Sequence, residues 1–224
     1  MKKRLFLLFL ACAFSVMVFT GCDYKLKDED WVSEISYYVW KSMSDNSGMK
    51  NIDSAHKEAF DSAFNDIEIL GARLCVPMKV SDLPDKFELS NSSGSEYTPP
   101  SEDTFGKDSG AGLKSYHFDL YYDREIEVAD VFVVCEKGQS IEEGIIYEFS
   151  LGGLCFQPVL LGGQVDINSD ISVMKDFLGE GNEFYDGFCT LCYTDGNRMI
   201  ELSYSINGDD VNFLLGYIKT YYLL

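Results

Sequence analysis

The chain has 224 residues and a formal net charge of −19, because 37 aspartates and glutamates outnumber 18 lysines and arginines. Nucleic-acid phosphates and anionic lipid headgroups are bound by clusters of basic residues, so this composition argues against both as partners of the folded surface. With 46% hydrophobic residues, the chain can bury a substantial core and is not disordered as a whole. The acidity would attract cationic partners or divalent cations, but keeping the protein soluble explains it more simply.

The first 21 residues have the three parts of a secretory signal peptide. Lys2, Lys3 and Arg4 form a cationic head, residues 5–19 are apolar except for Ser15, and two small residues follow. The apolar run is shorter than the ~20 residues that a membrane-spanning helix needs. The sequence therefore predicts a signal peptide over residues 1–21, with an uncleaved anchor as the alternative.

The end of this segment, Phe19-Thr20-Gly21-Cys22, resembles the lipobox of bacterial lipoproteins. The resemblance implies that the chain is cut before Cys22 and that a diacylglycerol is attached to the Cys22 sulfur. Acyl chains such as palmitate would then hold the protein on the extracytoplasmic face of the cell membrane. Several chains at ~0.8 kcal/mol per buried methylene give lasting attachment, where one chain gives only marginal binding. The alternative is an ordinary signal peptide followed by a chance cysteine.

Residues 22–71 are predicted to form a tether and N-terminal helices. Residues 23–30 are a charged spacer, and apolar residues then recur at helical spacing from Trp31 to Met43. A second helical stripe follows Asp53-Ser54, which can cap a helix. Its members are spaced three and four apart, as on one face of an amphipathic helix, and are His56, Ala59, Phe60, Ala63, Phe64 and Ile67.

Residues 72–151 are predicted to form a first α+β unit. A strand is expected over residues 74–80, and Pro84 limits the following segment to a turn. Residues 90–115 are rich in Ser, Gly, Pro and acidic residues, so we expect a mobile loop there. Three strands are then expected over residues 116–122, 126–135 and 144–151, with a hairpin turn at Asp123-Arg124.

Residues 152–224 are predicted to form a second unit of the same kind. Asn168-Ser169-Asp170 can cap a short helix that ends at Gly179. Strands are expected over residues 184–194, 199–205 and 211–219, with Asp195-Gly196 as a hairpin signal. The predicted fold class is therefore α+β, with two tandem units of a short helix or turn plus a three-stranded antiparallel meander, preceded by N-terminal helices.

The second half carries a resemblance to a known group of domains. Residues 170–179, 193–196 and 200–204 resemble bacterial lipoprotein domains of the BamE (SmpA/OmlA) and β-lactamase-inhibitor-protein group, which have an α+β fold. Residues 76–84 also resemble a sequence segment found in uncharacterised lipoproteins from Gram-positive gut bacteria. The resemblance implies that helices cover one face of a sheet and that the other face can bind a protein.

The sequence contains no residue pattern typical of catalysis, cofactor binding or metal binding. The only histidines are His56 and His117, and no GxSxG, HExxH or phosphate-binding glycine loop is present. A calcium-loop-like start at Asp166 fails, because Ile171 stands where the loop requires glycine. We therefore predict no catalytic residue, no cofactor and no metal ligand.

Five cysteines follow Cys22, so they cannot all pair within the chain; they are Cys75, Cys135, Cys155, Cys189 and Cys192. Cys189 and Cys192 lie three apart in a predicted strand and should point to opposite faces, which argues against a redox or zinc pair. We expect mostly small buried side chains, and the sequence leaves one disulfide open.

The chain is rich in tyrosine, which suits protein interfaces because a large ring carries a polar tip. Six tyrosines in predicted strands are candidate interface residues, with the core as the alternative for each: Tyr116, Tyr121, Tyr122, Tyr147, Tyr193 and Tyr204. The expected function is that of a membrane-anchored exported lipoprotein that binds or inhibits another envelope protein and is not an enzyme. A structural role in envelope assembly is the alternative, and a hydrolase that uses dispersed carboxylates is disfavoured.

Overall fold

The computed structural model describes residues 49–91, 97–100, 106–108, 113–152, 157–185, 188–207 and 210–220. These residues belong to one compact unit, Gly48–Leu224. The predicted signal peptide, the lipidation residue Cys22 and the helix expected from Trp31 to Met43 lie outside the described residues. In the part of the chain that is described, no helix combines the length and the apolar composition needed to cross a membrane.

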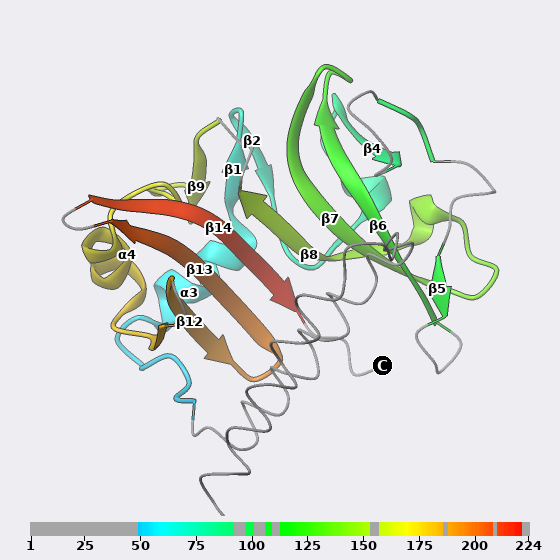
Figure 1. Ribbon diagram of the computed structural model, residues 1–224. Coiled ribbons are helices and arrows are strands. Elements are labelled where there is room, and N and C mark those ends of the chain that lie inside the picture. The colour runs from blue at the N-terminus through cyan, green and yellow to red at the C-terminus, as the bar shows by residue number, and fades with distance from the viewer. Residues whose placement is uncertain are drawn as a thin grey trace, which may run out of the picture. The chain divides into compact units, whose positions relative to one another are not determined.

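A ten-stranded antiparallel sheet dominates the unit (Figure 1). The first half of the chain contributes β4 (Phe87–Asn91), β6 (Leu113–Tyr122), β7 (Ile126–Glu136) and β8 (Ile145–Gly152). The second half contributes β11 (Asn182–Tyr185), β12 (Cys189–Asp195), β13 (Arg198–Asn207) and β14 (Asp210–Thr220). The strand order is β11-β12-β13-β14-β8-β7-β6-β4, while the short strands β3 (Met78–Lys79) and β5 (Lys107–Asp108) pair with β8 and β6. The two halves of this large sheet therefore meet where β8 pairs with β14.

A second sheet of four short strands is built in the same way. Its order is β10-β9-β1-β2, with β1 (Ile67–Ile69) and β2 (Ala72–Leu74) from the first half, and β9 (Val159–Leu161) and β10 (Val165–Asp166) from the second. β1 pairs antiparallel with β9, so that Ile67 lies opposite Leu161. Each half of the chain thus supplies one hairpin to this small sheet and one four-stranded run to the large sheet.

The described residues include two α-helices, α3 (Lys57–Asn65) and α4 (Ile171–Leu178), and two 3-10 turns, η1 (Val80–Asp82) and η2 (Ile141–Glu143). α3 occupies most of the stripe predicted from the sequence and buries Phe60 and Phe64. At its start, the Asp53 carboxylate accepts hydrogen bonds from the backbone N–H groups of Ala55 and His56. α4 ends at Gly179, whose φ of 86° favours glycine.

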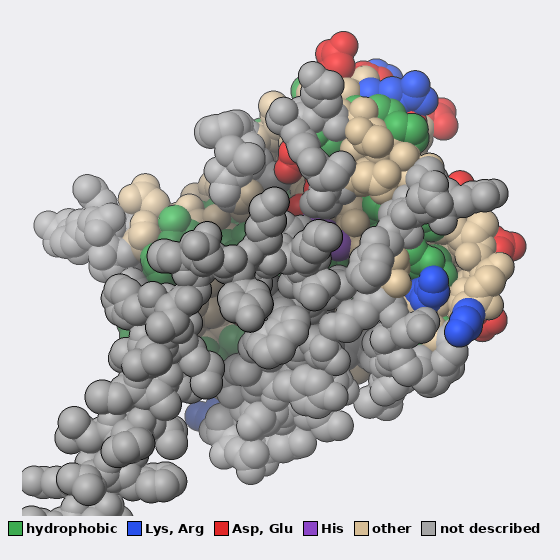
Figure 2. Space-filling model, turned by 45° about the vertical axis from the view of Figure 1, so that its right-hand side comes forward, with side chains coloured by type: hydrophobic (Ala, Val, Ile, Leu, Met, Phe, Trp, Pro, Cys, Tyr) green, Lys and Arg blue, Asp and Glu red, His purple; other side chains and the backbone are tan. Residues whose placement is uncertain are grey.

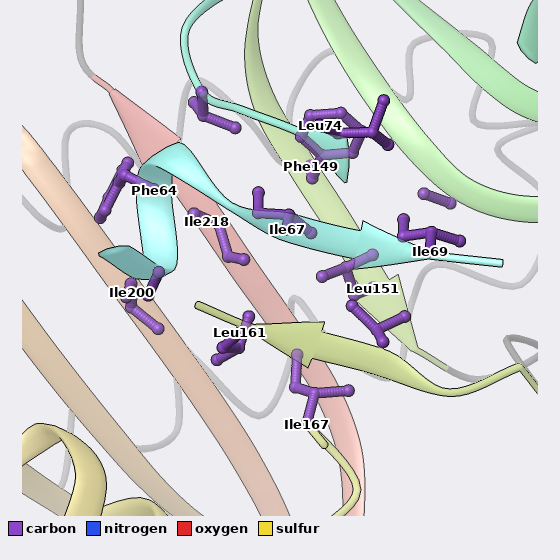
Figure 3. Close-up of a cluster of buried hydrophobic side chains, with 14 of the residues drawn as sticks. Phe64, Ile67, Ile69, Leu74, Phe149, Leu151, Leu161, Ile167, Ile200 and Ile218 are labelled. Atoms are coloured by element: carbon purple, nitrogen blue, oxygen red, sulfur yellow. The ribbon is translucent and has the colours of Figure 1, made fainter. Parts of the chain in front are cut away.

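The core lies between the large sheet and the small sheet (Figure 3). Ile67 and Ile69 of β1 face Leu151 of β8 and Ile218 of β14, at the junction between the two halves. Around them pack Phe64, Leu74, Phe149, Leu161, Ile167 and Ile200, and all these side chains are buried. Burial of apolar area contributes roughly 25 cal/mol per Å², so this junction is a main source of stability.

The predicted fold class of two helix-plus-meander units is wrong. The described chain is mostly antiparallel β-structure, with four-stranded runs instead of three-stranded meanders and a second sheet that was not expected. Ile67, taken as the last member of a helical stripe, lies in β1, and the segment 184–194 is divided between β11 and β12. One cause is that β1 pairs with β9 from the other half of the chain as well as with its neighbour β2, and local periodicity does not encode such distant pairing.

Other sequence predictions agree with the structure. The strands expected over 116–122, 126–135 and 144–151 correspond to β6, β7 and β8, and those over 199–205 and 211–219 correspond to β13 and β14. The helix after Asp170 is α4, and the Asp195-Gly196 signal marks the tight turn between β12 and β13. Much of the expected loop over 90–115 lies outside the described residues, although its two ends belong to β4 and β6.

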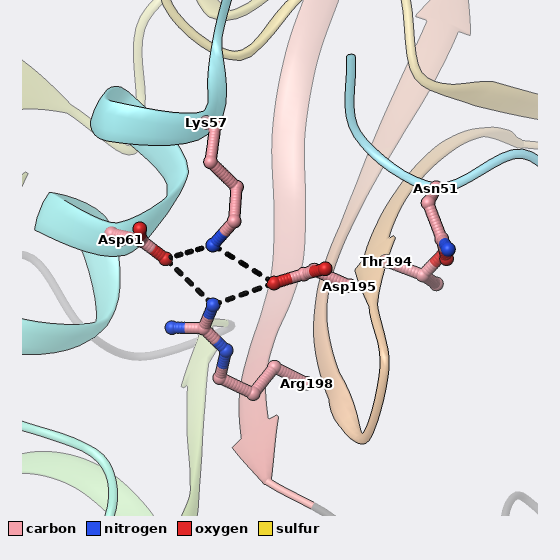
Figure 4. Close-up of polar contacts among 6 residues, drawn as sticks. All are labelled: Asn51, Lys57, Asp61, Thr194, Asp195 and Arg198. Atoms are coloured by element: carbon pink, nitrogen blue, oxygen red, sulfur yellow. Dashed lines mark hydrogen bonds and ion pairs between the residues drawn. The ribbon is translucent and has the colours of Figure 1, made fainter. Parts of the chain in front are cut away.

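An ionic network fixes α3 against the β12–β13 hairpin (Figure 4). The Lys57 ammonium lies 2.6 Å from Asp61 and 2.9 Å from Asp195. One nitrogen of Arg198 lies 2.6 Å from Asp61 and 2.7 Å from Asp195, and the guanidinium also lies over the rings of Phe60 and Phe64. Hydrogen bonds from Lys57 and Arg198 lower the pKa of both carboxyl groups below their usual 3.8.

The first prediction concerns the junction between the sheets. Ile67→Ala should lower the free energy of unfolding by about 2–5 kcal/mol, because it removes buried methyl groups and leaves a cavity. Urea denaturation of the full chain, followed by circular dichroism, measures the change. The control is Val173→Ala on the exposed side of α4, for which we expect a change within about 0.5 kcal/mol. Equal losses in the two variants would contradict the proposed core.

The second prediction concerns the ionic network. Arg198→Met should lower the free energy of unfolding by about 1–2 kcal/mol at pH 7, a value discounted because the four side chains are partly exposed to solvent. Because the pKa values of Asp61 and Asp195 are lowered in the folded state, their contribution is complete above the unfolded value of 3.8 and is lost as the pH falls below it.

Urea titrations at pH 3 and pH 7 test this pH dependence, since the difference between the wild type and Arg198→Met should shrink at the lower pH. Arg73→Met is the matched control, because Arg73 is exposed and lies 3.5 Å from a single carboxylate, that of Asp66. A difference that is independent of pH would contradict the assigned role of the network.

Candidate functional site

The large sheet has a second face, which points away from the small sheet and is called the polar face here. Side chains alternate along each strand, so residues on either side of core members such as Phe118 and Val131 lie on it. Its members on the first-half strands are Glu88, Ser90, His117, Asp119, Tyr121, Glu127, Asp130, Phe132, Glu148 and Ser150. Those on the second-half strands are Thr190, Cys192, Glu201, Ser203, Tyr217 and Lys219.

One histidine and two aspartates come together on β6 and β7 of the polar face. His117 Nε2 lies 3.1 Å from Asp130 Oδ1, and Asp119 lies directly opposite Asp130 in the antiparallel ladder. One donor atom from each of the three side chains lies within 4.8 Å of the others. The His117 ring stacks on Phe132, with centroids 4.7 Å apart and planes at 13°. The stacking and the strand pairing together hold the imidazole beside the two carboxylates.

More carboxylates surround this cluster. Burial raises the pKa of Glu127, and the negative charges of Asp119 and Asp130 raise it further. Tyr121 lies opposite Glu127 in the ladder, and its pKa is raised by burial and then by Glu127. The β6–β7 part of the polar face is therefore strongly negative, and it favours cations or cationic side chains.

The polar face also places a glutamate beside a lysine at the junction of the two halves. Glu148 on β8 and Lys219 on β14 are opposite each other, with 7% and 2% of their surfaces exposed. Burial raises the pKa of Glu148, an effect that the charge of Lys219 partly offsets. The Lys219 ammonium lies 5.0 Å from the centre of the Tyr217 ring. Removing either charge would be costly, because the remaining buried charge would lose its partner and few water molecules could solvate it.

A second group of charges lies at the end of the sheet beside the β6–β7 turn. In Figure 2, basic and acidic side chains gather at this upper end of the molecule. Arg124 donates a 2.8 Å hydrogen bond to Glu88 and lies over the Tyr97 ring, while Lys86 lies 2.9 Å from Asp123. These pairs are largely exposed and each contributes little, so we assign them to the surface of the fold.

The six candidate interface tyrosines do not form one surface. Tyr193 and Tyr204 are fully buried in the core, and their hydroxyl groups have no hydrogen-bond partner among the described residues. Tyr116 and Tyr122 are partly buried against the core. Tyr121 is buried on the polar face. The Tyr147 hydroxyl lies 3.0 Å from the Ser115 hydroxyl on β6, and the Tyr147 ring lies 6.3 Å from that of Phe132 on the polar face. Of the six, only Tyr121 and Tyr147 thus lie beside the His117 cluster.

The four described cysteines are free thiols, while Cys155 lies outside the described residues. Cys189 lies opposite the core residue Tyr204, and Cys192 lies opposite Glu201 on the polar face, so the two point to opposite sides of β12 as predicted. Burial raises the pKa of Cys192 to about 12. This pair is therefore placed for neither a disulfide nor a shared metal.

The third prediction follows from these thiols. In the folded chain at pH 8, Cys75 should react with iodoacetamide faster than Cys192, because Cys75 is half-buried while Cys192 is buried and its pKa is far above the pH. Peptide mapping by mass spectrometry measures both rates, and full labelling in guanidinium serves as the control. Equal rates in the folded chain would contradict the position given to Cys192.

The chain was compared with protein-family models, with curated proteins and with solved structures, and none of them matches it. The resemblance to the BamE and β-lactamase-inhibitor-protein group stays a prediction.

Sequence reasoning missed the cluster of His117, Asp119 and Asp130. The alternation of β6 does place His117 and Asp119 on one face, since they are two residues apart. Asp130 joins them only through the register of the β6–β7 ladder, which includes a bulge between Leu120 and Tyr121. A shift of one residue would send Asp130 to the other face, so the sequence signal was incomplete without the exact pairing.

Proposed function

We propose that this protein is a membrane-anchored, exported lipoprotein whose folded unit binds another protein through the β6–β7 part of the polar face. The observation that carries the proposal is the composition of that surface. Glu88, His117, Glu127, Asp130 and Phe132 are half-buried side chains on neighbouring strands, with an aromatic ring among carboxylates.

The expected partner has a basic surface. The net charge of −19 and the grouped carboxylates would speed the approach of a cationic partner, and matched charges would fix its orientation. Phe132 and Tyr147 would supply the apolar contact that charge alone does not provide, since aromatic residues are enriched at the centres of protein interfaces. The lipid on Cys22 would keep this surface close to the membrane, where envelope proteins are concentrated.

The fourth prediction tests the binding surface in the cells that make the protein. A photo-crosslinking phenylalanine analogue at position 132 should give one dominant protein adduct, whereas the same analogue at Val173 on α4 should not give it. The Glu127→Lys variant should lose this adduct, and so should high salt, because both weaken attraction to a basic partner. The proposal fails if positions 132 and 173 give the same adducts, or if the adduct is unaffected by charge reversal and salt.

The membrane anchor has a separate test. Mass spectrometry of the protein purified from its own membranes should find a chain that begins at a diacylglyceryl-modified Cys22. An unmodified thiol at this position, or a chain that still begins at Met1, would contradict the lipid anchor. The crosslinking experiment tests the binding surface independently of this result.

A further inference from the structure

The cluster of His117, Asp119 and Asp130 has the chemistry of a metal site. It offers one imidazole nitrogen and two carboxylates, all within 4.8 Å of one another. Imidazole nitrogen suits Zn²⁺ and other divalent transition metals, and zinc sites also use carboxylate oxygens as ligands. Ca²⁺ and Mg²⁺ prefer oxygen ligands alone, so the imidazole favours a transition metal over them.

The three donors are held by paired strands and not by loops. His117 and Asp119 share one face of β6, and Asp130 is the direct partner of Asp119 on β7. The Phe132 ring packs flat against the imidazole and restricts its rotation. Ligands on a rigid scaffold lose little freedom when they bind an ion, which favours affinity and a defined geometry.

The electrostatics of the cluster also call for a cation. Two aspartates directly opposite each other in an antiparallel ladder repel, and such a like-charged pair destabilises a sheet. Asp119 is only 5% exposed, so water screens this repulsion poorly. A divalent ion between the two carboxylates would replace the repulsion with attraction to both.

A further buried carboxylate lies beside the cluster. Glu148 lies on the polar face of β8, next to Phe132, and is 7% exposed. Lys219 lies opposite it on the next strand. Glu148 thus places one more acidic side chain near the His117 cluster, on the strand that pairs with β7.

We propose that His117, Asp119 and Asp130 bind one divalent transition-metal ion, with the imidazole and the two carboxylates on one side of the ion. The remaining coordination positions are left for water or for a side chain of a partner. The ion would be part of the structure of the polar face, and it would pin β6 to β7 within the proposed binding surface, because His117 and Asp130 belong to both. This inference does not depend on whether a protein binds there.

The fifth prediction uses Co²⁺ as a spectroscopic probe and Zn²⁺ as a competitor, added to the full chain in detergent. Co²⁺ should give a visible absorption band that saturates at one ion per chain and disappears when Zn²⁺ is added. Zn²⁺ should also raise the midpoint of thermal unfolding, because an ion that binds only the folded state stabilises it.

Two variants remove ligands without disturbing the core. His117→Gln and Asp130→Asn should each weaken Co²⁺ binding by at least about tenfold and reduce the thermal shift produced by Zn²⁺. Asp130 is partly exposed, so its substitution should leave the fold intact, and the circular dichroism of each variant checks this. The controls are Glu125→Gln, which removes one charge from the same hairpin, and His56→Gln, which removes the other described histidine; both should bind Co²⁺ as the wild type does.

Three outcomes would overturn the proposal. The first is the absence of a saturable Co²⁺ band in the wild-type chain. The second is a band that persists in both His117→Gln and Asp130→Asn, which would place the ion elsewhere. The third is weakening of the same size in Glu125→Gln, which would mean that the acidic surface merely accumulates cations. Loss of the crosslinks at position 132 with metal binding intact would count against the proposed function alone.

Discussion

The fold depends on antiparallel pairing between the two halves of the chain. β8 pairs with β14 in the large sheet, and β1 pairs with β9 in the small sheet. Both sheets therefore contain strands from both halves of the chain. The core is placed between these two seams, where Ile67 and Ile69 pack on Leu151 and Ile218. At the seam of the large sheet, Gly152 lies opposite Leu215, and a side chain there would run into the backbone of β14. The seams therefore require close backbone contact as well as apolar burial, and neither half could bury its inner face alone.

This architecture separates the work of the two sheet faces. One face of the large sheet is covered by the small sheet and the helices, and its burial stabilises the fold. The polar face carries charged groups whose mutual repulsion lowers the free energy of unfolding. Asp119 opposite Asp130 is the clearest example, since like charges directly opposite each other in a ladder repel. Groups that break a local rule in this way are more often explained by binding than by folding. The proposed cation and the proposed basic partner would both bind to this surface, and separate experiments test them.

The sequence predicted those parts of the structure whose pattern is local. Local strand patterns predicted β6, β7, β8 and β13, and the Asp170 and Gly179 signals predicted α4. The hairpin β1–β2 was not predicted, because its turn holds Leu70 at a φ of 53°, a conformation that leucine rarely adopts and that its presence in a sequence does not indicate. The fold class failed for a similar reason, since β1 finds its partner β9 about ninety residues away. For the site, residue types were visible, but only the bulged register of β6 and β7 brought His117, Asp119 and Asp130 together.

The position of β14 has a consequence for how the protein is made. It is the last strand of the described chain, yet it lies between β13 and β8 in the middle of the large sheet, while the outer strands β4 and β11 come from the interior of the sequence. A polypeptide emerging in order from a ribosome or a translocation channel therefore cannot close this sheet until residues 210–220 have appeared. A late stop codon before β14 would remove a central element and leave two unpaired strand edges, which makes such products prone to association and degradation.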